Sequence, residues 1–101
     1  MRLNRFAFAV TAAALLFAGS AYAENKIDPG SGLIIAPGFE VTKTNCTACH
    51  GAGFIITSGY SRDVWLEQIR WMQKDQGLWE FTPEVEKEIL DYLETYYPPK
   101  Q

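Results

Sequence analysis

The sequence predicts a small all-α protein with about three main helices. Two segments, residues 61–76 and 82–97, place apolar residues at helical spacing, and a third, residues 38–49, contains no proline. The chain has 101 residues, 48% of them hydrophobic, which fits one domain and excludes a disordered chain, a multidomain enzyme and a large catalytic barrel. Its net charge of −3 argues against nucleic-acid binding, because phosphate neutralisation needs a basic face.

The first 23 residues have the three parts of a secretory signal peptide. Arg2 and Arg5 give a positive start, residues 6–18 are apolar, and residues 21–23 form a small-x-small cleavage site. The apolar run of 13 residues is shorter than the roughly 20 that a helix needs to span a bilayer, so an uncleaved membrane anchor is the less favoured interpretation. We expect cleavage after Ala23, export to a bacterial periplasm and no membrane span in the mature chain.

The mature chain, residues 24–101, is small and acidic. Loss of Arg2 and Arg5 changes the net charge from −3 to −5. Its 78 residues bury a marginal core, and chains of this size usually need a disulfide, a metal, a cofactor or a partner to hold the fold. Residues 24–37, rich in proline and glycine, predict an irregular N-terminal arm with a short extended piece at residues 33–35, and residues 38–101 form the domain.

The first half of the domain contains one short helix and one loop. Residues 38–49 predict a helix leading into Cys46, and the glycines of residues 51–61 predict a loop. In residues 61–76, the i, i+4, i+7 spacing of Trp65, Ile69 and Met72 puts the three side chains on one helix face. Ser61 is a suitable N-cap for this helix and Gly77 a suitable stop.

Residues 82–97 give the clearest helix signal. Thr82 is a suitable N-cap, Pro83 suits the first helical position, and Glu84 and Glu86 complement the positive end of the helix dipole. The prolines at 98 and 99 end the helix. The expected buried stripe consists of Val85, Ile89, Tyr92, Leu93 and Tyr96.

One five-residue segment carries the chemistry of the chain. Both cysteines of the chain and its single histidine occur in Cys46-Thr47-Ala48-Cys49-His50. C-x-x-C-H is the attachment sequence of c-type haem. The spacing presents two thiols to the two vinyl groups of one porphyrin edge, and the following imidazole becomes the proximal iron ligand. A covalent porphyrin also brings a large apolar surface around which a small chain can fold.

Three other interpretations of this segment are weaker. A Cys46–Cys49 disulfide closes a very small loop and leaves His50 unexplained. A thioredoxin-like redox pair needs a βαβ pattern that the sequence does not have. A structural zinc site needs four ligands, and the sequence holds no third cysteine and no second histidine.

Met72 is the candidate for the distal iron ligand. It is the only methionine left after signal-peptide removal, and the lack of a second histidine excludes bis-His coordination within one chain. A methionine as the distal ligand raises the reduction potential of the haem iron, which suits electron transfer. A lysine amine and an open site stay as alternatives, and a methionine beside Trp65 and Ile69 also fits core packing. The tryptophans and tyrosines mostly fit packing in the core and the haem crevice. A tryptophan N–H group, Arg62 or Arg70 is the alternative as a partner for a haem propionate, and the sequence does not select one of them.

The segment from residue 38 to residue 97 resembles small monohaem class I cytochromes c. Gly38 stands eight residues before Cys46, as a glycine does in many of them, and residues 89–93 are similar to their terminal helix. The resemblance implies that the first and last helices cross at Gly38 and Tyr92 and that the fold wraps around one covalent haem. The chain departs from the family at Thr42, where an aromatic residue is common.

The position of Met72 makes the chain similar to a smaller group within this family. It lies 22 residues past His50, closer than the usual axial methionine, in the pattern Trp65-x-x-x-Ile69-x-x-Met72. This compact pattern is similar to cytochrome subunits of periplasmic dehydrogenases of the sulfite dehydrogenase type. The expected function is therefore a non-catalytic periplasmic one-electron carrier with one haem c, held by Cys46 and Cys49 and ligated by His50 and Met72. It would accept electrons from a dehydrogenase and pass them to another cytochrome or an oxidase.

Two alternative functions stay open at the level of the sequence. A tightly bound haem subunit of a dehydrogenase complex would relay electrons internally, and the proline- and glycine-rich arm fits such an interface. A five-coordinate haem protein would bind or reduce a small ligand, although the chain offers no distal histidine for peroxide cleavage. The acidic helix at residues 84–94 fits either a solvated face or a surface that steers a basic partner.

Overall fold

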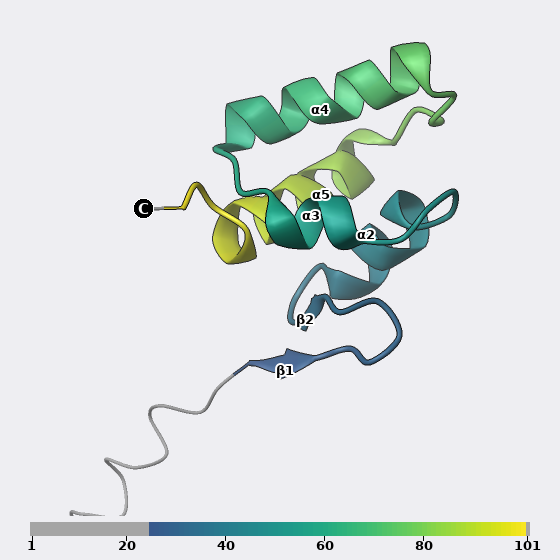
Figure 1. Cartoon of the computed structure of the whole chain (residues 1–101). Helices are drawn as coiled ribbons and strands as arrows, with labels where there is room; N and C mark the ends of the chain where they lie inside the picture. Colours follow the sequence, from purple (N-terminus) through teal and green to yellow (C-terminus); the bar gives the residue numbers. More distant parts are fainter. Residues whose placement is uncertain (1–24, 101) are drawn as a thin grey trace, which may run out of the picture.

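The fold is mostly helical, as the sequence predicts. A computed structural model describes residues 25–100, so the predicted signal peptide lies outside the described residues. Within that range a two-stranded hairpin precedes four helices (Figure 1). None of these helices is long and apolar enough to span a membrane. The elements are β1 (Lys26–Ile27), β2 (Ile34–Ile35), α2 (Phe39–Cys46), α3 (Gly53–Thr57), α4 (Arg62–Asp75) and α5 (Pro83–Tyr96).

Helix α5 is the centre of the packing. Both α2 and α4 pack extensively against it, whereas α2 and α4 have no comparable contact with each other. Figure 1 shows the hairpin and α4 at opposite ends of the domain, with α2, α3 and α5 between them. The core is built from the apolar stripes of these elements. Its most deeply buried apolar side chains are Leu33, Ile55, Trp65, Ile69, Ile89, Tyr92 and Leu93.

Helices α2 and α5 meet at a glycine. Gly38 precedes α2 with a φ of 92°, and a Cβ built on it would lie 2.7 Å from Tyr92 Cβ and 3.1 Å from the Glu88 carbonyl oxygen. Only glycine fits both this left-handed conformation and this close approach. Thr42, one turn further along α2, is fully buried, and its Oγ1 has no hydrogen-bond partner within residues 25–100. The two helices therefore approach each other closely at Gly38, and their crossing buries the Thr42 hydroxyl without a hydrogen-bond partner in the described residues.

The N-terminal arm is more regular than the sequence predicts. The expected extended piece is present as β2, but it pairs antiparallel with β1, which the sequence analysis did not identify. Two tyrosine side chains hold β2 to the domain, because Tyr92 Oη donates to the Ile34 carbonyl at 2.6 Å and the Ile34 amide donates to Tyr97 Oη at 3.0 Å. Burial and the adjacent Tyr97 raise the pKa of Tyr92, so its hydroxyl stays protonated and can donate.

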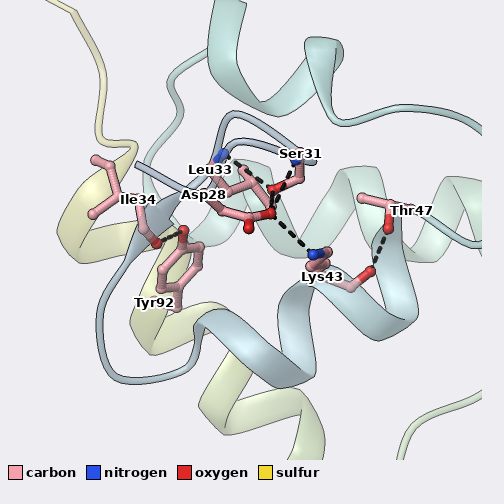
Figure 2. A network of polar contacts seen from close by, with 7 residues as sticks. All are labelled: Asp28, Ser31, Leu33, Ile34, Lys43, Thr47 and Tyr92. Carbon is pink, nitrogen blue, oxygen red and sulfur yellow. Dashed lines mark hydrogen bonds and ion pairs between the residues drawn. The ribbon is translucent and has the colours of Figure 1, made fainter. Parts of the chain in front are cut away.

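A polar network fixes the hairpin turn to α2 (Figure 2). Asp28 accepts hydrogen bonds from the amide and hydroxyl of Ser31, at 2.9 and 2.7 Å, and lies 2.9 Å from Lys43 Nζ. The Ser31 hydroxyl and the Lys43 ammonium lower the pKa of Asp28 to about 2. The arm is thus tied to the helix that carries Cys46.

The capping signals of the two long helices are confirmed. Ser61 Oγ accepts from the Val64 amide at the start of α4, and Thr82 Oγ1 accepts from the Val85 amide at the start of α5. The buried stripe of α5 also includes Leu90, which the sequence analysis did not name, whereas Val85 and Tyr96 are only partly buried. These helices form where local signals and apolar periodicity agree.

The expected loop at residues 51–61 is wrong in part. It contains α3, whose sequence Gly-Phe-Ile-Ile-Thr places Ile55 in the core at 1% exposure. The glycines on either side predict a loop from local preference, but burial of an apolar side chain stabilises one helical turn and a half here. The turn matters for the site because it carries Phe54.

Candidate functional site

A cavity of about 380 Å³ lies between the end of α2, helix α3 and one face of α4. Its volume falls within the roughly 300–1,000 Å³ that is common for small-molecule and cofactor sites. The four residues that the sequence analysis assigned to the site, Cys46, Cys49, His50 and Met72, all line this one cavity. The rest of the lining consists of Asn45, Phe54, Ser58, Tyr60, Trp65, Gln68, Trp71, Gln76 and Leu78.

Helix α4 gives the cavity its longest wall. Trp65, Gln68, Met72 and Gln76 follow one another at intervals of three or four residues, so they form one face along the whole helix. The predicted face of Trp65, Ile69 and Met72 is divided in the structure: Trp65 and Met72 line the cavity, whereas Ile69 is buried in the core and is not part of the lining. Met72 is therefore placed in a cavity wall and only half-buried, and not in a closed core.

The two cysteines differ in their surroundings. Cys46 is the last residue of α2 and packs against the core, and burial raises the pKa of its thiol to about 11. Cys49 is exposed in the loop that follows. Both cysteines are free thiols in this structure. The loop is held at its start by Thr47, whose amide and Oγ1 both bond to the Lys43 carbonyl, at 3.1 and 2.6 Å.

The His50 ring is oriented by two neighbours. Its Nδ1 lies 3.1 Å from the Gly51 carbonyl oxygen, and its ring meets Phe54 edge to face with centroids 5.0 Å apart. A carbonyl oxygen only accepts, so Nδ1 carries the proton in this hydrogen bond and the neutral ring keeps its lone pair on Nε2. A hydrogen bond of this kind commonly fixes the tautomer of a metal-binding histidine.

Aromatic rings close the inner end of the cavity. Trp65 is 1% exposed, meets Tyr60 edge to face at 4.8 Å, and donates its indole N–H to the Tyr97 carbonyl at 2.9 Å. This bond uses the only donor of the Trp65 ring. This wall is therefore apolar toward the cavity and held in place, because the indole N–H of Trp65 is bonded to the backbone of the C-terminal segment.

The arginines proposed as propionate partners are engaged elsewhere. Arg62 donates to Asp91 at 2.7 Å and Glu94 at 3.0 Å, and Arg70 makes a two-bond contact with Glu86. Neither arginine lines the cavity. Both of them instead link α4 to α5, a pairing that the sequence order could not reveal.

The polar part of the lining was not predicted from the sequence. Ser58, Gln68, Gln76 and Asn45 carry the hydroxyl and amide groups of the wall. The two glutamines lie one turn from Trp65 and Met72, so extending the helical face of Met72 through polar positions would have found them. Asn45 directly precedes Cys46, but its contact with Trp79 depends on the fold.

Family models, curated proteins and solved structures gave no significant match to this chain. Within residues 25–100, no group of three or more His, Cys, Asp or Glu side chains is arranged to hold a metal ion. A haem iron takes four of its ligands from the porphyrin and needs only axial ligands from the protein. The axial donors expected from the sequence are His50 and Met72, and both line the cavity.

Proposed function

We propose that this chain is a monohaem cytochrome c that carries one electron at a time between proteins of the bacterial periplasm. The observation that carries the proposal is the shared cavity of Cys46, Cys49, His50 and Met72. These residues are contributed by the end of α2, the following loop and helix α4. Their types are two thiols, one imidazole and one thioether, the set that a covalent haem with His and Met axial ligands requires.

The residues of the cavity fit a haem group in chemistry as well as in number. Cys46 and Cys49 would each add S–H across a vinyl C=C bond, which forms a thioether and needs no oxidant. His50 has Nε2 available as a ligand because Nδ1 is bonded to Gly51. Met72 would supply its sulfur from the α4 wall, and Phe54 and Trp65 offer apolar surfaces for packing against the porphyrin.

When bound, the haem supplies an iron that cycles between the ferric and ferrous states. The chain contributes the environment of that cycle. Trp65 and Tyr60 would place apolar surface against the porphyrin, which would keep the local dielectric constant low. The Gly51 carbonyl orients His50, and the neutral thioether of Met72 favours the ferrous state and so a higher potential.

The proposed partners are redox proteins. A periplasmic dehydrogenase would be the donor, and another cytochrome or an oxidase the acceptor. The mature net charge of −5 implies that electrostatic docking to a basic partner weakens as salt rises. Permanent attachment to a dehydrogenase is the second candidate, favoured by two indole rings that are about half exposed, Trp71 and Trp79.

The decisive experiment is spectroscopy of the full chain expressed in a bacterium with a haem-attachment system. We expect a periplasmic product shortened by 23 residues that carries one haem after denaturation. Its reduced form should give sharp low-spin bands that carbon monoxide does not shift, and its ferric form should give the weak long-wavelength band of a thioether ligand. A carbon monoxide shift with high-spin character would instead support ligand binding, and absence of covalent haem would refute the proposal.

Variants in the C-x-x-C-H segment and at Met72 test the covalent attachment of haem and its distal ligand separately. Replacing both cysteines, Cys46→Ser with Cys49→Ser, should abolish covalent haem, whereas Thr47→Ser in the same loop should retain it because the hydroxyl bond to Lys43 is kept. Met72→Leu should retain covalent haem but lose the thioether band. Full retention of that band in Met72→Leu would show that another residue is the distal ligand.

A further inference from the structure

The two walls of the cavity lack a helix–helix contact of their own. Cys46 ends α2 on one side and Met72 lies in α4 on the other, and each helix packs against α5 without comparable packing between the two. Their separation therefore depends on α5, on which both helices pack, and on any direct connection between them. The segment that follows α4 provides a direct connection.

That segment folds back at Met72. The amides of Gln76 and Leu78 both donate to the Met72 carbonyl, at 3.0 and 3.1 Å, and Gly77 between them has a φ of 78°. The left-handed glycine lets the chain reverse direction directly after the last turn of α4. The reversal brings Trp79 toward the end of α2.

Trp79 then joins the two walls. Its indole Nε1 donates to Asn45 Oδ1 at 2.9 Å, and its backbone carbonyl accepts from Gln73 Nε2 of α4 at 3.2 Å. Asn45 is itself fixed, because its Nδ2 donates to the Val41 carbonyl of α2 at 2.9 Å. The bridge is thus anchored on α2 directly before Cys46 and on α4 directly after Met72.

Burial does not explain the position of this ring. Trp79 is 47% exposed, so much of its apolar surface faces water and its orientation depends on the hydrogen bond to Asn45. Trp71 is a natural comparison, since it is 51% exposed and lines the cavity, but residues 25–100 offer its indole N–H no hydrogen-bond partner. The two rings are similarly exposed, and of the two only Trp79 is bonded to α2 through its indole N–H.

We propose that Trp79 is a positioning residue whose hydrogen bond to Asn45 holds the α4 wall at the distance from Cys46 at which the Met72 sulfur can reach the haem iron. The inference rests on the proposed function, because it assigns Trp79 to the geometry of that site. Loss of the bond would let the end of α4 move outward, so that a larger fraction of molecules has Met72 detached from the iron. A competing ligand would then bind more readily, since its apparent affinity scales with that fraction.

The test compares Trp79→Phe with Lys74→Ala in the haem-loaded protein, because Lys74 is exposed near the same end of α4 and does not line the cavity. One neutral hydrogen bond contributes about 0.5–1.5 kcal/mol, so we expect Trp79→Phe to lower the carbon monoxide pressure for half-conversion about two- to thirteenfold. The thioether band of the ferric form should weaken in parallel. Lys74→Ala should match the unmodified protein in both measurements, and equal values for the two variants would overturn the proposal.

A double-mutant cycle with Asn45→Ala tests whether the effect of Trp79→Phe comes from the hydrogen bond between Trp79 and Asn45. If it does, the carbon monoxide pressure for half-conversion of the double variant should differ from that of either single variant by less than about twofold. Fully additive effects would overturn the assignment. Failure of both single variants to accumulate as haem-loaded protein would show that the bond serves folding and would also overturn it. Failure of the proposed function is distinguishable, because it would appear in the unmodified protein as missing haem or a missing thioether band.

Discussion

The hairpin side of the domain, comprising β1, β2 and the α2–α5 crossing, is closed by its own side chains, whereas the cavity side, comprising α3, α4 and residues 45–50, is not. On the hairpin side Tyr92 and Tyr97 bond to both polar groups of Ile34. On the cavity side the walls border a cavity of about 380 Å³. The hairpin side is therefore held together by contacts within the chain, whereas the cavity side has room for the haem that we propose.

The largest expected effect is at the helix crossing of the hairpin side. Gly38→Ala would place a methyl group 2.7 Å from Tyr92 Cβ and 3.1 Å from the Glu88 carbonyl, at a φ of 92°. Overpacking and left-handed strain together should lower the free energy of unfolding by about 3 kcal/mol or more. Chemical denaturation measures it. Gly53→Ala, where a Cβ meets nothing within 4 Å, is the matched control and should change stability little.

Loss of the proposed haem should affect the two sides unequally. Amide hydrogen exchange would be compared between the haem-loaded protein and the Cys46→Ser, Cys49→Ser double variant. We expect protection in α3 and α4 to fall about 100-fold, which corresponds to about 2.7 kcal/mol, and protection of the Ile34 amide to fall much less. An equal loss on both sides would contradict the comparison, because it would show that the hairpin side does not stand alone.

The tyrosine bonds of the hairpin side can be tested singly. Tyr92→Phe removes the donor to the Ile34 carbonyl and leaves that carbonyl without its partner, so the free energy of unfolding should fall by about 1–2 kcal/mol. Tyr96→Phe is the control, since residues 25–100 offer its hydroxyl no hydrogen-bond partner. Urea unfolding distinguishes the two variants, and equal stability would show that packing alone holds β2.

The smallest expected effect concerns acid stability. Because the pKa of Asp28 is lowered to about 2 from an ordinary 3.8, its ionised form stabilises the fold above about pH 4, and this contribution is lost as the pH falls toward 2. Asp28→Asn keeps an oxygen for Ser31 but loses the charge that pairs with Lys43. Its unfolding free energy should therefore depend less on pH between 4 and 2 than that of the unmodified protein or of Asp75→Asn. Identical slopes would contradict the prediction.

Local signals in the sequence predict the long helices well. The caps Ser61 and Thr82 bond as their residue types suggest, and α4 and α5 begin where they were expected. Strand β1 and helix α3 were missed because each depends on distant partners. The β1 strand needs β2 to pair with, and α3 needs the core that receives Ile55. Short elements of this kind carry too little local preference to be recognised alone.

The candidate site likewise contains residues that the sequence alone reveals and contacts that only the fold reveals. Cys46, Cys49 and His50 were found because their spacing within five residues is itself the signal, and Met72 because no other methionine is left in the mature chain. The contact between Asn45 and Trp79 joins residues 34 positions apart and has no local signature. The assignment of Arg70 to Glu86 likewise follows from the packing of α4 on α5, which only the folded chain shows.

The carbonyl of Tyr97 connects the segment after α5 to the cavity. It accepts from the Tyr60 amide at 3.2 Å and from the Trp65 indole at 2.9 Å. One backbone oxygen therefore holds two of the aromatic residues that line the cavity, and a change in the path of the chain after Tyr96 would alter the cavity without replacing any residue of its lining.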